Sequence, residues 1–394
     1  MALAETTHSA QTTWPFDRLG LVVAGLALIG ATTPFVAFRA NRIVAGKAAM
    51  LWDVLPGWET GIIGAALAAA ALVGARRIAP TLRLLIGLAA LLVLAVAIGD
   101  AARSLTPLGD KISRTSPGTG FWLLALAFAL QTSDAVARLR LKPLSRIGIL
   151  AGIVIVVAAI LWSGLWNDLS VLREYANRAD DFWREAGTHL ALAFGSLAAA
   201  TLAGIPIGIV CERAPRARAV ILNTLNGVQT IPSIALFGLL IAPLAWIAAT
   251  VPGASAIGIA GIGVAPAMVA LFLYSLLPVV ANTVAGLDGV PEATDEAARG
   301  MGMTYRQRLW QIDLPLAFPV ILTGIRIVLV QNIGLATVAA LIGGGGFGVF
   351  VFQGVGQTAM DLVLLGAVPT VALAFAAGIV LDAAVEMASP GGRT

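Results

Sequence analysis

A charged segment between two long apolar stretches holds the residues whose types and spacing point most clearly to a task. Glu296, Ala297 and Ala298 are followed by Gly302, and then by Ile312, Leu314 and Pro315 just before the next apolar stretch. Small residues allow another backbone to approach closely, and the Glu296 carboxylate offers a partner for a basic group. The segment could dock a cytosolic partner, and an ordinary well-capped loop would fit the same residues.

The residues around this segment predict a helix, a turn and a second helix. Pro291, with Glu292 and Asp295 close behind, suits the first turn of a helix, where the backbone dipole favours negative charge. Gly300 and Gly302 are expected to end that helix. Thr304 and Gln307 match a capping box that starts a second short helix. We expect Pro315 to end the second helix and to lead into the next apolar stretch.

The composition indicates an all-α membrane protein. Hydrophobic residues make up 59% of the chain, charged residues 12%, and the mean hydropathy is +0.92. A soluble domain carries about 25% charged residues, so this chain has too little polar surface to fold in water. The single cysteine excludes an internal disulfide, and with two histidines it leaves little for metal or nucleophilic chemistry. We expect no cofactor, no metal, no nucleic-acid partner, and membrane lipid around the chain.

Apolar runs of roughly 20 residues are long enough to cross a bilayer, and they predict about ten transmembrane helices. Residues 1–17 lack a basic segment of the signal-peptide kind, so we expect the first run to be an uncleaved anchor. We expect three parts: an accessory bundle of about five helices over residues 1–166, an extracytoplasmic segment over 167–187, and a five-helix core over 188–388. The runs are Leu19–Phe38, Thr60–Ala75, Leu82–Ala101, Gly120–Val136, Ile147–Trp166, Thr188–Val210, Val220–Ile247, Val264–Leu287, Leu316–Ile342 and Leu362–Met387.

The distribution of arginine and lysine among the loops predicts that both termini are cytosolic. Loops on the other side dilute their basic residues with many carboxylates, and cytosolic loops of membrane proteins are enriched in basic residues. This orientation places the segment around Glu296 in the cytosol. The cytosolic loops then carry Arg76, Arg77, Arg83, Arg138, Arg140, Lys142, Arg146, Arg213, Arg216, Arg218, Arg299, Arg306 and Arg308.

Two nucleotide-binding patterns were tested against the sequence. A P-loop needs a lysine followed by serine or threonine, and none of the three lysines has such a neighbour. Gly343, Gly345 and Gly348 match the spacing of a dinucleotide-binding loop, but that loop requires a preceding strand, and here it joins two apolar runs. We expect these glycines to form a flexible turn beside an outer gate. Any ATP that drives this protein must be hydrolysed on a separate subunit.

Polar residues within the apolar runs are candidates for a translocation path or gate. Arg326 must find water, a carboxylate or backbone carbonyls, either in a structural ion pair or on the path. Gln229, Thr230, Pro232 and Ser233 lie within the seventh run, where Pro232 removes a helical hydrogen bond. Unwound helix at membrane depth is tolerated where it lines a cavity, and a simple packing kink is the alternative. The pairs Gly148/Gly152 and Gly204/Gly208 predict close helix packing.

The spacing of Glu296, Ala297, Ala298, Gly302, Ile312, Leu314 and Pro315 resembles the signature loop of the permeases of binding-protein-dependent ABC importers. In that family the loop, here 288–315, forms a coupling helix that inserts into the ATP-hydrolysing subunit. Five stretches, one of them within this loop, resemble the permeases for quaternary-ammonium osmoprotectants such as glycine betaine, choline and carnitine: Gln229–Ser233, Leu271–Ser275, Leu277–Thr283, Glu296–Thr304 and Ala336–Gly348. The resemblance covers about half of the chain, and the preceding helices are similar to those of an N-terminally extended subgroup.

The resemblance implies a permease subunit of the inner membrane with a type I importer core, not an enzyme. It implies a cytosolic ATPase dimer, a second permease subunit of the same or a related kind, and an extracytoplasmic binding protein. Aromatic cages usually hold quaternary ammonium groups, and the chain has only three tyrosines, of which Tyr274 is a candidate for the path. Selectivity is therefore expected in the binding protein. The alternatives are a permease for another small solute, such as an amino acid, and a secondary transporter.

Overall fold

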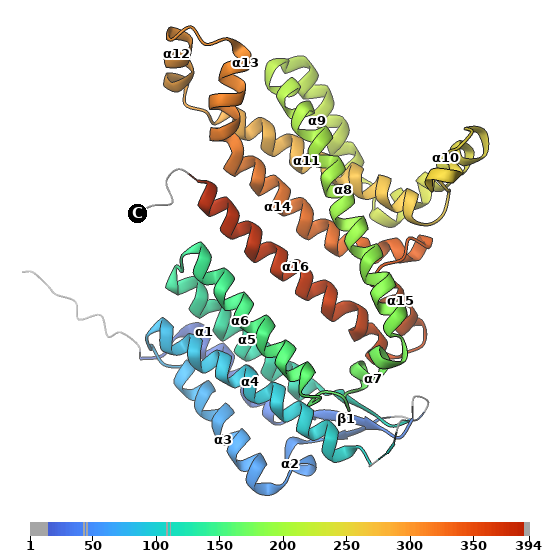
Figure 1. Ribbon diagram of the computed structural model, residues 1–394. Coiled ribbons are helices and arrows are strands. Elements are labelled where there is room, and N and C mark those ends of the chain that lie inside the picture. Colours follow the sequence, from blue (N-terminus) through green and yellow to red (C-terminus); the bar gives the residue numbers. More distant parts are fainter. Residues whose placement is uncertain (1–14, 42–43, 45, 108, 111, 390–394) are drawn as a thin grey trace, which may run out of the picture. The chain divides into compact units, whose positions relative to one another are not determined.

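The computed structural model describes residues 15–41, 44, 46–107, 109–110 and 112–389 (Figure 1). Residues 1–14, most of the segment whose lack of basic residues supported an uncleaved first run, lie outside the described residues. The chain forms two compact units, which are described separately below. The first comprises Met1–Leu141 and Ala158–Ser170, and the second comprises Lys142–Val157 and Val171–Thr394. The helix α6 (Pro143–Trp162) contributes residues to both units.

Four helices pack together in the first unit. They are α1 (Arg18–Ala31), α3 (Gly57–Gly74), α4 (Pro80–Leu105) and α5 (Thr119–Leu139), joined by a single-turn helix, α2 (Leu51–Val54). α1 packs against α3 and α5, and α4 packs against the same two helices. Each helix therefore has two neighbours.

A small antiparallel sheet lies beside these helices and was not predicted from the sequence. Its strands are β1 (Val36–Arg39), β2 (Lys47–Ala49) and β3 (Arg114–Pro117), in the order β2-β1-β3. Val36 pairs with Ala49 on one side and with Pro117 on the other. The first predicted run, Leu19–Phe38, is therefore too long: α1 ends at Ala31, because the Thr32 and Thr33 hydroxyls bind Leu28 and Ile29 carbonyls and Pro34 follows.

Long helices dominate the second unit. α8 (Ala179–Arg213) packs against α11 (Val264–Asp288) and α14 (Leu314–Val338), and α14 packs against α16 (Met360–Ala388). A Cβ atom at Gly204 would lie 2.7 Å from Val279 Cγ1, which confirms the close packing predicted for Gly204/Gly208. The same prediction was wrong for Gly148 and Gly152 in α6, where a Cβ would meet no atom within 4 Å. The shorter elements are α7 (Ser170–Asn177), α9 (Pro215–Thr230), α10 (Ser233–Thr250), η1 (Ser255–Ile257), α12 (Glu292–Gly300), α13 (Tyr305–Arg308), η2 (Leu309–Asp313), η3 (Ala339–Ile342) and α15 (Gly348–Gly356).

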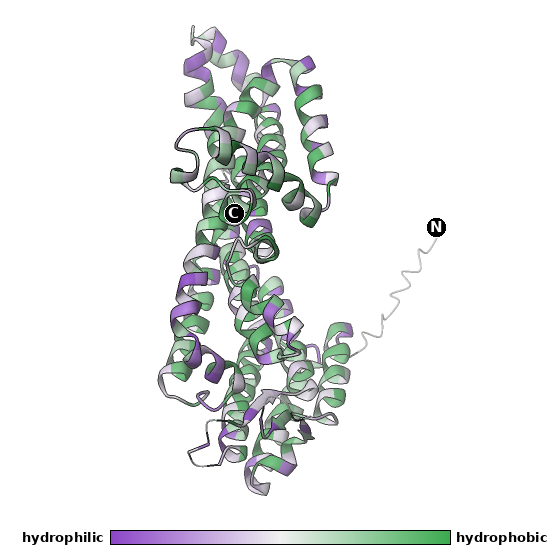
Figure 2. Cartoon of the chain, turned by 90° about the vertical axis from the view of Figure 1, so that its right-hand side faces the viewer, coloured by the Kyte–Doolittle hydropathy of each residue, from purple (hydrophilic) through white to green (hydrophobic). Residues whose placement is uncertain are grey.

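The predicted fold class, an all-α membrane protein, is confirmed. Nine helices in the described part of the chain are long and apolar enough to cross a membrane, compared with about ten predicted. α1, with 14 residues, is apolar but shorter. Figure 2 shows apolar residues over most of the helix surfaces and hydrophilic residues at the end of the second unit that contains α12 and α13.

The seventh predicted run, Val220–Ile247, is two helices in the structure and not one. α9 ends at Thr230 and α10 begins at Ser233, and Ile231 and Pro232 between them have extended backbone angles. The residue before a proline is disfavoured in helical conformation, and the proline has no N–H to donate, so the break falls where both effects act.

Candidate functional site

The charged segment has the predicted helix–turn–helix form. α12 begins after Pro291 and ends at Gly300, and Gly302 follows in the left-handed region at φ 77°. The Met303 N–H donates to the Ala298 carbonyl at 3.1 Å, which closes the turn. The predicted capping box is present: the Thr304 N–H donates to Gln307 Oε1 at 2.8 Å, and the Gln307 N–H donates to Thr304 Oγ1 at 3.4 Å.

The second short helix does not end at Pro315, which corrects the prediction. α13 continues through a π-turn, η2, directly into α14. The Leu314 N–H donates to the Leu309 carbonyl, five residues back, and Pro315 then occupies the first turn of α14. Inside a continuous helix a proline clashes with the carbonyl four residues back, here that of Gln311, which lies within the wider π-turn. The turn and the membrane helix therefore form one continuous element.

Ionic and aromatic contacts hold this segment together and connect it to α8. Asp295 of α12 pairs with Arg308, and with Arg299 at 2.6 Å. The Arg213 guanidinium, at the end of α8, lies 3.3 Å from the centre of the Tyr305 ring, a cation–π contact. A displacement of α12 can therefore reach the end of α8 through Arg308 and Tyr305.

The predicted docking residues differ in how far their side chains are exposed. Glu296, Ala297 and Gly302 are exposed, whereas Ala298 is fully buried beneath them. Ile312 and Leu314 are partly buried, and Pro315 is exposed. Met301 and Trp310, which the sequence reasoning did not single out, are 73% and 70% exposed. Both are large apolar residues in a charged segment that ends at Pro315, and this contrast could have identified them from the sequence.

Tyr274 and Gln229, two of the predicted path residues, meet at the break between α9 and α10. The Tyr274 hydroxyl donates to the Ile231 carbonyl at 2.5 Å, and the Gln229 side-chain amide donates to the Tyr274 carbonyl at 2.9 Å. The Tyr274 carbonyl lacks a helical donor because Pro278, four residues later in α11, has no N–H. Each proline thus frees backbone acceptors, and a side chain from the opposite element satisfies them.

The other predicted path residues around this break are more exposed. Thr230 is exposed and donates from its hydroxyl to the Gly227 carbonyl at 2.7 Å. Pro232 is exposed and Ser233 is partly buried. The structure brings these residues together with Gln229 and Tyr274, but Arg326 lies on a different helix, α14, with other partners.

A buried polar contact among three core helices was missed by the sequence reasoning. The Asn332 amide of α14 donates to the hydroxyl oxygens of Ser196 (α8) and Ser275 (α11), at 2.8 and 2.9 Å, and all three residues are fully buried. Each serine hydroxyl also donates to a carbonyl of its own helix. An asparagine at this depth in a 25-residue apolar helix was the signal that pointed to it.

Arg326 belongs to a cluster of four charged groups in the second unit. Its guanidinium lies 2.7 Å from Asp382 of α16, and Arg146 lies 2.7 Å from the same carboxylate and also pairs with Glu386. Asp382 and Glu386, near the end of α16, are therefore both paired with arginine. Among the three partners foreseen for Arg326, the structure contains the carboxylate.

The glycine-rich loop is fixed to the start of α8. The Gly346 N–H donates to Glu185 Oε2 at 2.7 Å, and the His189 ring lies against Phe347, with ring centres 5.0 Å apart. Gly343, Gly345 and Gly346 all have positive φ, which only glycine adopts without strain. His189 is fully buried. No cluster of metal-ligating side chains occurs among the described residues.

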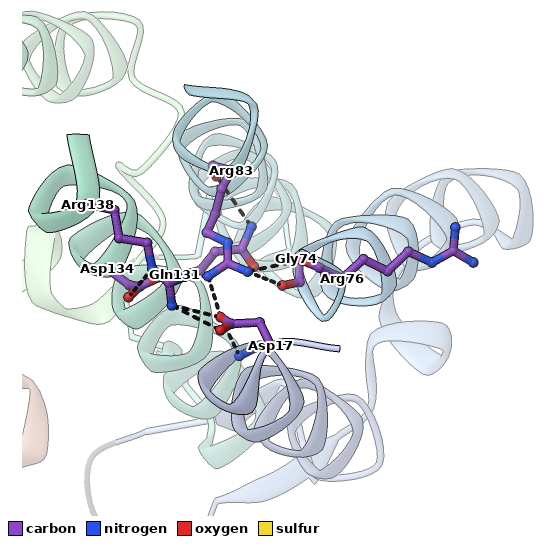
Figure 3. Close-up of polar contacts among 8 residues, drawn as sticks. Asp17, Gly74, Arg76, Arg83, Gln131, Asp134 and Arg138 are labelled. Carbon is purple, nitrogen blue, oxygen red and sulfur yellow. Dashed lines mark hydrogen bonds and ion pairs between the residues drawn. The ribbon is translucent and has the colours of Figure 1, made fainter. Parts of the chain in front are cut away.

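A second charge cluster lies in the first unit, where Figure 3 shows Arg83 at its centre. Arg83 pairs with Asp17 at 2.5 Å and Asp134 at 2.6 Å, and it donates to the carbonyls of Gly74 and Arg76 at 3.1 Å. Arg138 pairs with both carboxylates. Burial acts to raise the pKa of the Asp17 carboxyl, but hydrogen bonds from Arg83 and Arg138 outweigh it, so the pKa lies below its usual value. The cluster therefore joins the ends of four helices, α1, α3, α4 and α5.

Comparisons with known proteins divide the sequence in two. Residues 17–172 match the family model of the N-terminal domain of the ABC transporter permease YehY. Residues 204–393 match the model of the inner membrane component of binding-protein-dependent transport systems. The osmoprotectant import permease protein OsmW of Salmonella typhimurium is 42% identical over 194 residues, which cover 49% of this chain and 83% of that protein.

Two relatives from Bacillus subtilis each match about half of the chain. The choline transport system permease protein OpuBB is 35% identical over 52% of this chain and 87% of its own length. The glycine betaine/carnitine/choline transport system permease protein OpuCB is 33% identical over 53% and 88%. Among solved structures, an inward-facing MetNI methionine ABC transporter chain is 23% identical, with a TM-score of 0.46 over 53% of this chain and 96% of that one.

These matches confirm the resemblance inferred from the charged segment and its neighbours, including the N-terminal extension. A relative that is 42% identical and matched over 83% of its length establishes this kinship, and the family model matches residues 204–393. The chain therefore belongs to the family of inner membrane components of binding-protein-dependent ABC transport systems.

Proposed function

We propose that the chain is the permease subunit of an ATP-driven importer for quaternary-ammonium osmoprotectants of the glycine betaine, choline and carnitine kind. The proposal is supported by the chain's relatives, whose names describe transport of such solutes. The single observation that carries the transport role is the exposed face of α12 and the turn after it. In this reading residues 1–166 are an accessory bundle, 167–187 an extracytoplasmic segment and 188–388 the transport core.

ATP hydrolysis would take place on a separate cytosolic subunit that receives this face. Glu296 and Ala297 would contact the ATPase directly, together with Met301 and Trp310, whose exposed apolar surfaces suit a protein interface. Ala298 would let α12 lie close to its own support, and Gly302 would set the turn. Ile312, Leu314 and Pro315 would join the segment to α14.

Each chain has one docking segment, and an ATPase dimer needs two. The importer would therefore contain two copies of this permease, or this permease and a related one. Both termini would lie in the cytosol, and a separate binding protein would deliver the solute on the opposite side. ATP-driven closure of the ATPase dimer would move α12, and the contacts of Asp295 with Arg308 and of Arg213 with Tyr305 would pass the movement to α13 and α8. The helices would thereby open alternately to each side.

The path would pass the break between α9 and α10. Extended backbone at Ile231 and Pro232 leaves helix ends at membrane depth, and such a break is tolerated where it borders a cavity. Gln229, Thr230, Pro232, Ser233 and Tyr274 would form a gate there. Arg326 would act through its pairing with Asp382, which can separate when α14 and α16 move.

The test uses tagged full-length chain purified in mild detergent. Gly302→Pro should abolish co-purification of a P-loop ATPase and solute uptake, because proline cannot adopt φ 77°. Glu296→Lys should weaken both through charge reversal. Gly300→Ala is the matched control, since a Cβ there meets no atom within 4 Å and its φ is ordinary.

The outcomes separate the docking role from the solute. Normal ATPase recovery and uptake in both the Gly302→Pro and Glu296→Lys variants, with normal membrane insertion, would contradict the docking role. Uptake assays with labelled glycine betaine, choline and methionine then test the solute class. Transport of methionine alone would keep the importer and overturn the osmoprotectant assignment.

A further inference from the structure

A large apolar cavity opens between α1 and α3 in the first unit. Its volume is about 550 Å³, within the range of sites that bind small molecules. Gly25 and Ala31 of α1, Gly64 and Ala68 of α3, and Leu124 of α5 are among its lining residues. A Cβ atom at Gly25 or Gly64 would meet nothing within 4 Å, so these helix faces leave a space that no side chain fills.

The two helices are in close contact at one end of the cavity, because a Cβ atom at Gly20 of α1 would lie 2.7 Å from the Ala75 Cα at the end of α3. Phe35, Leu51 and Trp52 line its opposite end. Exposed Leu28 and Leu72 are also in the lining. The end with Phe35 lies next to the sheet, since the Phe35 N–H donates to the Ala49 carbonyl of β2.

Water is a poor occupant of this space. The polar side chains in the lining include Thr33 and Thr60, and each hydroxyl already donates to a helix carbonyl, at 3.0 Å to Ile29 and 3.3 Å to Leu55. A buried water needs two to four polar partners, so a cavity with such a lining stays dry. An apolar ligand is the chemistry that the lining fits.

The length of the cavity matches one leaflet of a bilayer. Along α3 its lining extends from Thr60 to Leu72, twelve residues further on, which corresponds to about 18 Å of helical rise. Half of a hydrocarbon core of roughly 30 Å is about 15 Å. A single acyl chain of one leaflet is therefore the apolar group that would span it from end to end.

Two basic residues lie on the strands that lead away from the end of the cavity lined by Phe35 and Leu51. Arg39 ends β1 and Lys47 begins β2, four residues after Phe35 and four before Leu51, and Phe38 pairs with Lys47 in the sheet. Neither residue has an ion-pair partner within the described part of the chain. Trp52, which is 55% exposed, lies between apolar and polar surroundings, as tryptophans at the membrane interface do. A phosphate group beside these residues would complement their charge.

We propose that the space between α1 and α3 binds one acyl chain of an anionic phospholipid, with its phosphate beside Arg39 and Lys47. The lipid would complete the packing of the first unit, as an additional buried element that the polypeptide does not supply. The proposal requires only that this unit lies in a membrane, and it does not depend on the transported solute.

Native mass spectrometry of the full-length chain tests the site. Purified protein would be reconstituted in nanodiscs of phosphatidylglycerol or phosphatidylcholine, released into mild detergent, and the phospholipid retained per chain counted. We expect one tightly held phosphatidylglycerol and little phosphatidylcholine. Gly64→Phe should fill the cavity and lose the bound lipid. Gly61→Phe is the matched control, because Gly61 lies in the same helix, has equally open space and does not line the cavity.

Two further measurements keep the proposal open to refutation if Gly64→Phe folds poorly. Phosphatidylglycerol brominated on its acyl chain should quench the fluorescence of the unmodified protein, and Trp52→Phe should remove part of that quenching. Arg39→Ser combined with Lys47→Ser should abolish the preference for the anionic lipid. Equal retention in the Gly64 and Gly61 variants, or quenching unchanged by Trp52→Phe, would overturn the site. Loss of a chain–chain dimer in Gly64→Phe, without loss of lipid, would assign the space to a second copy and overturn it as well.

Discussion

The two charge clusters have almost the same composition and differ in burial. In the first unit the Arg83 side chain is 3% exposed, and its partners Asp17 and Asp134 are 14% and 15% exposed. In the second unit Arg146 is 22% exposed, and Asp382 and Arg326 are 39% and 40% exposed. Both clusters join helices that are distant in sequence.

This difference separates a permanent connection from one that can open. A buried arginine cannot leave its carboxylates without stranding charge in an apolar interior, which costs several kcal/mol. Partly exposed groups can be hydrated when they part, so their pairing contributes little to stability. The Arg83 cluster therefore suits a unit whose helices stay together, and the Arg326 cluster suits helices that move during a transport cycle.

The largest effect is expected for Arg83→Ala. The substitution leaves Asp17 and Asp134 with Arg138 alone, and we expect a loss of about 3–5 kcal/mol in the stability of the first unit. Thermal unfolding of the full chain in detergent measures it. Arg77→Ala, an exposed position in the loop three residues before α4 begins, is the control and should change little. Equal melting of the two variants would remove the distinction between the clusters.

An intermediate effect is expected for Asn332→Leu in the second unit. Leucine keeps much of the side-chain volume, and both serine hydroxyls remain bonded to their own helices, so the loss is that of the contacts among three helices. Such contacts between membrane helices contribute about 0.6–2 kcal/mol. Thermal unfolding measures the change, with Ser275→Ala as a milder companion. A variant more stable than the natural protein would show that the buried amide is retained for another reason.

The smallest effect on stability, with a large effect on uptake, is expected for Asp382→Asn. Arg146 keeps Glu386, and Arg326 loses its carboxylate, so the stability should fall by about 1 kcal/mol or less. Glu386→Gln disturbs Arg146 alone and is the control for uptake. Melting measured beside solute uptake separates the two properties. A stability loss as large as that of Arg83→Ala would mean that this cluster is a fixed connection too.

Local chemistry allowed much of this molecule to be predicted. The capping box of Thr304 and Gln307, the helix end near Gly300 and the packing at Gly204 depend on neighbours within a few residues or on one face of a helix, and all three are present. The family resemblance came from the spacing of seven residues between 296 and 315. The docking and path roles of the individual residues stay predictions.

Features that depend on distant partners could not be predicted. Asn332 meets serines 136 and 57 residues away, and nothing in the local sequence gives that distance. The strands of the small sheet are three or four residues long, too short for an alternating pattern. Pro315 indicated a helix end, because a proline disfavours a continuous helix. The π-turn before Pro315 allows the helix to continue, and this turn depends on the register of the whole helix.

The π-turn at Leu309–Asp313 also sets the angular phase between the docking segment and the membrane helix. It places one residue more in a turn than an α-helix holds. The wide turn absorbs that residue, whereas in regular α-helix the same residue would lengthen the element by about 1.5 Å and rotate everything before it by about 100° relative to α14. If Leu309–Asp313 became regular α-helix, the exposed face of α12 would therefore point in a new direction while every residue type in it stayed the same. The geometry of this turn is thus as much a part of the proposed docking surface as Glu296.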